Sequence, residues 1–205
     1  MLLSATCSAE EKEQRLTTQG PRTLTFQQGV RGYKKTIDTE LWEVAPNKPL
    51  LYSGTVTVDG NNSGGESQVL MRFDGIIGKG LGRIPPRSTI LSAKLVVHAF
   101  DPGNTVNLHQ MLVPWKKSAT WNNMVSGVAA NGLEASRNKD GFTFGKLLAD
   151  QQSVEFDVTD TVQIWVNGQP NYGWVFMNMG GNGWDFHSSE SKDTGARPKL
   201  VVQFR

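Results

Sequence analysis

The chain has 205 residues, of which 38% are hydrophobic and 20% charged, and these proportions exclude a chain that is disordered throughout. The formal net charge of +2 is too small to attract the whole molecule to a nucleic acid, and no run of about 18 apolar residues exists that would span a membrane. Cys7 is the only cysteine, which excludes an internal disulfide.

Residues 1–22 are predicted to be an N-terminal arm or linker. The apolar start at 1–7 has no basic residue before it and is too short for a complete signal peptide. A charged run, EEKEQR at 10–15, follows it and favours a solvated segment. Residues 23–205 are then expected to form one β-sandwich domain, because all-β domains often reach about 200–250 residues.

Nine runs have the length, composition and flanking turn residues of β-strands. In chain order they are 23–26, 50–58, 68–73, 90–100, 106–112, 154–158, 174–177, 184–187 and 200–204. One segment predicts a helix, with Asp160 as its cap, Gln163 three residues later and Gly168 as its end, and a second helical turn is expected at 143–150. The pattern predicts an antiparallel β-sandwich of the jelly-roll type with one or two short helices.

Period-2 alternation divides the strands into two faces. In 90–100, the residues expected to face the core are Leu91, Ala93, Leu95, Val97 and Ala99. In this strand and in the runs 68–73 and 106–112, the positions on the opposite, outward side carry four basic side chains: Arg72, Lys94, His98 and His109. If the strand order brings these four together, they form a face that suits an acidic polysaccharide, because arginine and lysine bind carboxylates through charge-assisted hydrogen bonds. The alternative is an ordinary solvated sheet face.

A second basic and aromatic cluster lies in a predicted loop and consists of Arg31, Tyr33, Lys34 and Lys35. It is a further candidate for binding an acidic ligand. For Tyr33 the alternative is a structural anchor. The aromatic residues Trp165 and Trp174 are expected in the core.

No catalytic residue is predicted, since the chain has no H-E-x-x-H, paired-cysteine or G-x-S-x-G motif. Five aspartates lie near strand ends: Asp38, Asp74, Asp101, Asp157 and Asp185. We expect them to hold loops through backbone hydrogen bonds, and a structural Ca²⁺ ligand is the alternative. A glycosidase pair of carboxylates is not excluded by counting, because such a pair is defined by its separation.

Short motifs follow one another in order along residues 23–204. They are FQQG at 26–29, GY at 32–33, IDT at 37–39, LMRFD at 70–74, IPP at 84–86, ILSAKL at 90–95, TWN at 120–122, FDVT at 156–159, NYGW at 171–174, HSSE at 187–190 and RPKL at 197–200. Together they resemble DNRLRE-type domains, a family similar to carbohydrate-binding modules for alginate-like polysaccharides. The chain departs from the family pattern at Lys34 and Lys35, where small residues are usual, and at 59–66 and 131–140, which read as enlarged loops.

The resemblance implies a secreted or cell-surface β jelly roll that binds polysaccharide without catalysing a reaction. The leading hypothesis is therefore a non-catalytic extracellular module for an acidic polysaccharide, with no nucleic acid partner. The main alternative is an extracellular matrix, coat or filament subunit that self-associates by adding its N-terminal arm to a partner's open sheet edge. A small polysaccharide lyase or hydrolase is the third hypothesis.

Overall fold

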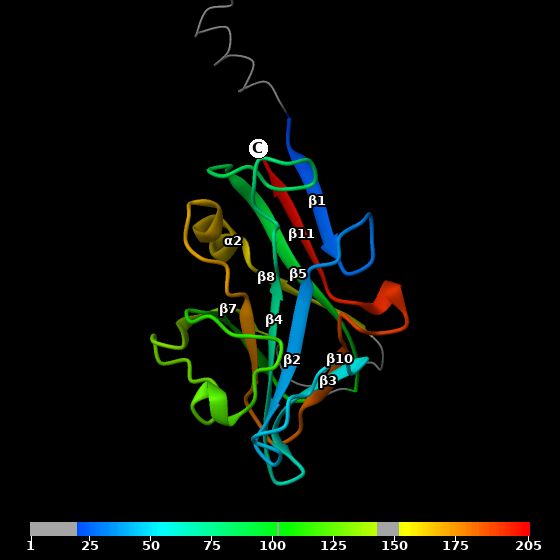
Figure 1. Ribbon diagram of the computed structural model, residues 1–205, viewed down its shortest axis with the longest axis vertical. Coiled ribbons are helices and arrows are strands. Elements are labelled where there is room, and N and C mark those ends of the chain that lie inside the picture. Colours follow the sequence, from blue (N-terminus) through cyan, green and yellow to red (C-terminus); the bar gives the residue numbers. More distant parts are fainter. Residues whose placement is uncertain (1–19, 102, 143–151) are drawn as a thin grey trace, which may run out of the picture.

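A computed structural model describes residues 20–101, 103–142 and 152–205. Most of the predicted N-terminal arm, together with the helical turn predicted at 143–150, lies outside the described residues. In Figure 1 most strands follow the long axis of the molecule, and the helix α2 (Thr159–Val166) packs at one side. Within the described ranges, no helix is both long and apolar enough to cross a membrane.

Two groups of antiparallel strands form the layers of a β-sandwich, which confirms the predicted fold class. The first sheet contains β1 (Arg22–Gln27), β11 (Lys199–Phe204), β5 (Ile90–Asp101), β8 (Gln152–Asp157) and β10 (Trp184–His187). The second contains β2 (Thr36–Trp42), β4 (Gly65–Phe73), β9 (Trp174–Asn178), β6 (Val106–Met111) and β7 (Ala135–Phe142). The strand β3 (Thr55–Asn62) pairs with β10 and with β4, so one hydrogen-bonded network joins both layers.

Two of the observed strands, β2 and β7, were not predicted. The segment of β7 was expected to be an enlarged loop, and that expectation is wrong because its polar residues pair with β6 through the backbone. The other expected loop, at 59–66, is mostly the hairpin of β3 and β4. Its turn residues Ser63 and Gly64 have φ values of 56° and 94°, as a tight two-residue hairpin of this kind requires.

The start of β5 differs from the expected alternation by one residue. Leu91 was expected to face the core, but it is 38% exposed and Ile90 is buried instead. The reason is a register shift opposite β11, where Gln203 pairs with Ser92 and Phe204 pairs with Ile90. A bulge of this kind turns the adjacent side chain to the other face of the strand.

Helix α2 begins one residue before the predicted cap. Val158 occupies the cap position without a side-chain hydrogen bond, and Asp160 lies in the first turn. Asp157 instead accepts hydrogen bonds from the amide and the hydroxyl of Thr159. The predicted glycine end is confirmed, because Gly168 follows the helix with a φ of 112° and donates its amide to the Trp165 carbonyl.

The sandwich has two hydrophobic clusters rather than one. The main core fills the space between the sheets and includes Trp165 and Trp174, as predicted. The second cluster lies on the outer face of the second sheet, where residues 112–134 (the covering segment) place Trp115 and Trp121 over Leu70. The covering segment therefore closes much of the outer face of the second sheet, whereas the described residues place no such segment over Lys94 on the outer face of the first.

Candidate functional site

The strongest candidate site is a pocket between the β1–β2 loop and the glycine-rich loop after β4. Its volume is about 210 Å³, and its lining residues are Arg31, Gly32, Tyr33, Lys34, Lys35, Gly75, Leu81, Gly82 and Arg83. We call it the basic pocket. It gathers the second predicted cluster around one concave surface and adds Arg83, which the sequence reasoning missed.

The β1–β2 loop is fixed by its own backbone. The amide of Gly29 donates to the Tyr33 carbonyl and the amide of Tyr33 donates to the Val30 carbonyl. Arg31 and Gly32 have positive φ values of 48° and 81°, so the chain turns sharply just before the two lysines. This turn places Arg31, Lys34 and Lys35 on the same exposed rim.

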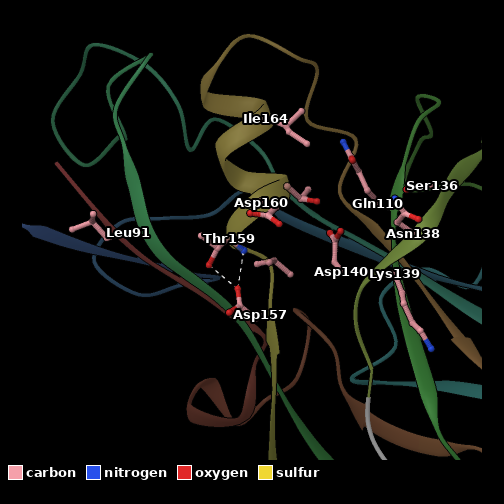
Figure 2. Close-up of a pocket in the computed structure, with 12 residues that line it drawn as sticks. Leu91, Gln110, Ser136, Asn138, Lys139, Asp140, Asp157, Thr159, Asp160 and Ile164 are labelled. Atoms are coloured by element: carbon pink, nitrogen blue, oxygen red, sulfur yellow. Dashed lines mark hydrogen bonds between the residues drawn. The ribbon is translucent and has the colours of Figure 1, made fainter.

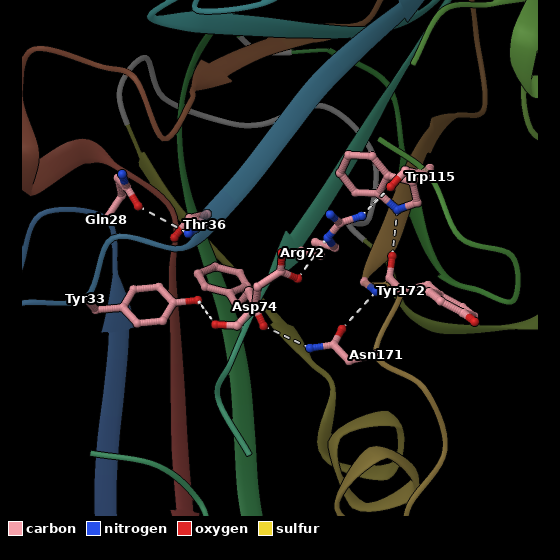
Figure 3. A network of polar contacts seen from close by, with 10 residues as sticks. Gln28, Tyr33, Thr36, Arg72, Asp74, Trp115, Asn171 and Tyr172 are labelled. Carbon is pink, nitrogen blue, oxygen red and sulfur yellow. Dashed lines mark hydrogen bonds and ion pairs between the residues drawn. The ribbon is translucent and has the colours of Figure 1, made fainter. Parts of the chain in front are cut away.

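Tyr33 anchors the pocket to the sandwich, as its structural alternative proposed. Its hydroxyl donates to the Asp74 carbonyl at 3.0 Å, and its ring contacts Phe26 and Phe73 at centroid distances of 5.4 and 6.5 Å. Burial raises the pKa of the Tyr33 hydroxyl well above its usual range. Figure 3 shows this hydroxyl directed at Asp74, at one end of a polar network that continues to Trp115 and Tyr172.

The glycine-rich loop forms the opposite wall. Its ends are closed by the hydrogen bond from the Ile84 amide to the Ile76 carbonyl. A Cβ atom at Gly78 would lie 2.9 Å from Cδ of Arg83, and one at Gly75 would lie 3.3 Å from Cδ of Lys35. The glycines therefore leave room for the aliphatic stems of these two cations, and a larger side chain at either position would displace them.

The electrostatic character of the basic pocket follows from its unpaired cations. Arg31, Lys34, Lys35 and Arg83 are all exposed. Among the described residues, no carboxylate forms an ion pair with any of these four side chains. A concave surface with several exposed cations that form no ion pair among the described residues attracts anionic groups.

The four basic residues predicted to share an outward face do not share one. Arg72 and His109 lie on the outer side of the second sheet, whereas Lys94 and His98 lie on the outer side of the first. The sequence alternation placed each side chain on the correct face of its own strand. Strand order, which the sequence does not show, separates them into two pairs.

Arg72 lies beneath the covering segment. Its Nε forms an ion pair with Asp74 at 2.8 Å, another guanidinium nitrogen donates to the Trp115 carbonyl, and the guanidinium lies 4.6 Å from the centre of the Trp115 ring. Its side chain is 17% exposed. Figure 3 shows it directed at Trp115 and away from the basic pocket's tyrosine.

The other three residues have different surroundings. His109 is buried, with Nδ1 at 2.9 Å from the Ser136 carbonyl. Lys94 is exposed and pairs with Glu155 at 2.7 Å. His98 lies beside His187 at a ring distance of 5.7 Å, and burial together with His98 lowers the pKa of His187. Whether Arg72, Lys94, His98 or His109 contacts a ligand stays a prediction.

Two of the strand-end aspartates hold loops as expected. Asp38 accepts the Ser189 amide at 2.8 Å and Asp157 accepts the Thr159 amide at 3.0 Å. Burial raises the pKa of Asp38 to about 6. In the part of the chain that the structure describes, no group of three or more histidine, cysteine, aspartate or glutamate side chains is arranged to hold a metal ion.

Arg83 was missed because its partners in the pocket are distant in the sequence. The signal that would have found it is the run GIIGKGLGR at 75–83, in which glycines alternate with cations and an exposed leucine. Glycines at this density permit a loop whose long side chains lie flat against the backbone.

Comparison with protein families gives one match. The family model of carbohydrate-binding module family 96 matches residues 52–204, which includes the glycine-rich wall of the basic pocket and leaves Arg31, Lys34 and Lys35 outside the matched region. No curated protein matches the chain.

Proposed function

Because the chain belongs to carbohydrate-binding module family 96, we propose that it binds an acidic polysaccharide through the basic pocket and catalyses no reaction itself. The observation that carries the acidic specificity is the set of four cations, Arg31, Lys34, Lys35 and Arg83, which have no ion-pair partner among the described residues.

The chemistry of the pocket suits a chain of uronate sugars. The planar guanidinium of an arginine binds a carboxylate through two parallel hydrogen bonds, and a lysine adds a mobile point charge. Leu81 is fully exposed at the edge of the pocket and offers an apolar contact for a sugar ring. Because the cations are exposed, their attraction for a polyanion falls as salt rises.

The proposal also assigns the protein a location outside the cell. Acidic polysaccharides of matrices and cell walls are extracellular polymers, and a module that binds them acts as a secreted or surface protein. A binding module of this kind brings the chain that carries it to the polymer, so its activity is measured as binding and not as product formation.

The test is binding of the full chain to alginate, pectate and a neutral glucan at low and high salt. We expect salt-sensitive binding to the uronates, weakened about tenfold or more by the double variant Lys34→Ala and Lys35→Ala, because two charge-assisted contacts are lost. The matched control is Lys48→Ala with Lys192→Ala, which removes the same charge from two exposed lysines elsewhere.

Equal loss in both double variants would mean that net charge, and not the basic pocket, determines binding. Failure to bind either uronate would overturn the proposal. A concentration-dependent oligomer that requires residues 1–25 would then favour the assembly subunit that the sequence offered as its alternative.

A further inference from the structure

A larger cleft lies on another part of the sandwich, between the β6–β7 edge of the second sheet and the start of α2. Its volume is about 630 Å³. We call it the polar cleft, and the residues that define it are Gln110, Ser136, Asp140, Asp157, Asp160 and Ile164. Figure 2 shows Gln110 and Asp140 on the strand side and Thr159, Asp160 and Ile164 on the helix side.

Gln110 is the first sign that the polar cleft binds a ligand. It lies on the core side of β6, two residues after Leu108 and opposite Trp174, and it is 8% exposed. Within the described residues its amide makes no hydrogen bond, and in Figure 2 it extends into the cleft. The amide is not among the buried side-chain groups left without a partner, so it reaches the surface of the cleft, where it can donate two hydrogen bonds and accept two.

Asp140 is the second sign. One of its oxygens accepts the indole N–H of Trp174 at 2.6 Å. Trp174 is itself held against Trp165 at a ring distance of 4.7 Å. The carboxylate is therefore fixed on a rigid base, and a carboxylate that is fixed in this way can accept two neighbouring hydroxyl groups of a sugar.

The charges of the polar cleft are opposite to those of the basic pocket. Asp140, Asp157 and Asp160 line it, and the cation Lys139 extends toward Asn107, with its Nζ 3.4 Å from the amide oxygen. A polyanion would be repelled here. Ile164 and the exposed Leu91 add apolar surface at the helix side.

We infer that the polar cleft is a second saccharide site, which binds an uncharged sugar through Gln110 and Asp140 and disfavours uronates. A cation is the competing occupant, but among the described residues no carboxylate group is arranged to hold a metal ion. The inference rests on membership of the carbohydrate-binding family and is independent of the acidic specificity proposed for the basic pocket.

The direct test is titration of the isotopically labelled full chain with cellohexaose, laminarihexaose, maltohexaose and mannohexaose, followed by amide chemical shifts. We expect at least one of these neutral oligosaccharides to shift the amides of Gln110, Ser136 and Thr161. Shifts elsewhere only, or none with any of the four sugars, would overturn the inference. Displacement of the sugar by an oligouronate that binds in the polar cleft would also overturn it.

Substitutions separate the two sites. Gln110→Leu keeps the size of the side chain and removes its hydrogen bonds, so we expect about a tenfold loss of affinity for the neutral sugar. The matched control is Gln203→Leu, an exposed position on β11. Should Gln110→Leu fail to fold, Asp140→Asn, which keeps an oxygen for the Trp174 indole, replaces it, with the same loss expected.

The two proposals fail in different ways. The double variant Lys34→Ala and Lys35→Ala should weaken uronate binding and leave neutral-sugar binding unchanged, and Gln110→Leu should do the reverse. If Gln110→Leu and Asp140→Asn both bind the neutral sugar like the unaltered protein, the polar cleft is not the site, whatever the basic pocket binds.

Discussion

Arg72 and Arg83 are close in the sequence but have opposite surroundings in the fold. Arg72 lies under the covering segment, paired with Asp74 and stacked on Trp115. Arg83 lies over Gly78 in the basic pocket, exposed and without an ion-pair partner among the described residues. The protein itself satisfies the charge of Arg72, whereas the proposed function assigns the charge of Arg83 to a ligand.

The largest effect expected from this comparison is on Arg72. Its replacement in Arg72→Ala removes an ion pair, a hydrogen bond and a cation–π contact from a mostly buried position, which should lower the free energy of unfolding by about 2–3 kcal/mol. Chemical denaturation measures this value. Arg83→Ala is the matched control, with an expected change within about 0.5 kcal/mol. Similar losses in both variants would remove the distinction between the two arginines.

Glu40 extends the comparison from the two arginines to a buried acidic side chain. It lies on β2 and accepts the Thr57 amide at 3.0 Å. Burial, assisted by the charge of Asp185, raises its pKa to about 7, although the Thr57 hydrogen bond acts in the opposite direction. The folded state therefore retains this proton to a higher pH than the unfolded chain, whose glutamate has a pKa of 4.5. The contribution of this raised pKa to the free energy of unfolding is fully present below the unfolded pKa and is lost as the pH rises through about 7.

Glu40→Gln cannot ionise and keeps an oxygen for the Thr57 amide. We expect the variant to be more stable than the unaltered protein by about 1–2 kcal/mol near pH 8, and the gap to close near pH 4. Denaturation at both pH values gives the two differences. A stability difference of the same size at both pH values would mean that packing, and not the buried charge, separates Glu40→Gln from the unaltered protein.

The fold was predicted from its apolar alternation, and the errors occur where that signal is absent. The segments at 90–100 and 184–187 match β5 and β10 because large apolar residues alternate along them. The strand β7 reads ASRNKDGF, whose polar side chains resemble a loop while its backbone pairs with β6. The register shift at Leu91 depends on its pairing partner in β11, which local sequence does not contain.

The candidate sites were predicted only in part, for a related reason. Arg31, Lys34 and Lys35 are neighbours in the sequence, so their cluster was visible without a structure. Arg83 joins them through the fold. Gln110 is one glutamine in an otherwise ordinary strand, and no sequence pattern says whether a buried amide finds a partner. Sites built from distant segments require the pairing of strands to be known.

The smallest effect is expected from replacing Lys94. This lysine is neither mostly buried like Arg72 nor without an ion pair among the described residues like Arg83. It is exposed like the lysines of the basic pocket, but Glu155 lies 2.7 Å from its Nζ and offsets its charge. We expect Lys94→Ala to leave both the unfolding midpoint and the affinity for uronates unchanged within error, because exposed ion pairs contribute little and this one presents no free cation. Affinity for alginate and denaturation midpoints measure the two quantities. A loss of uronate affinity as large as that of the Lys34 and Lys35 double variant would mean that the ligand also contacts the outer face of the first sheet. Exposure, rather than the lack of an ion-pair partner, would then decide which cations bind the ligand.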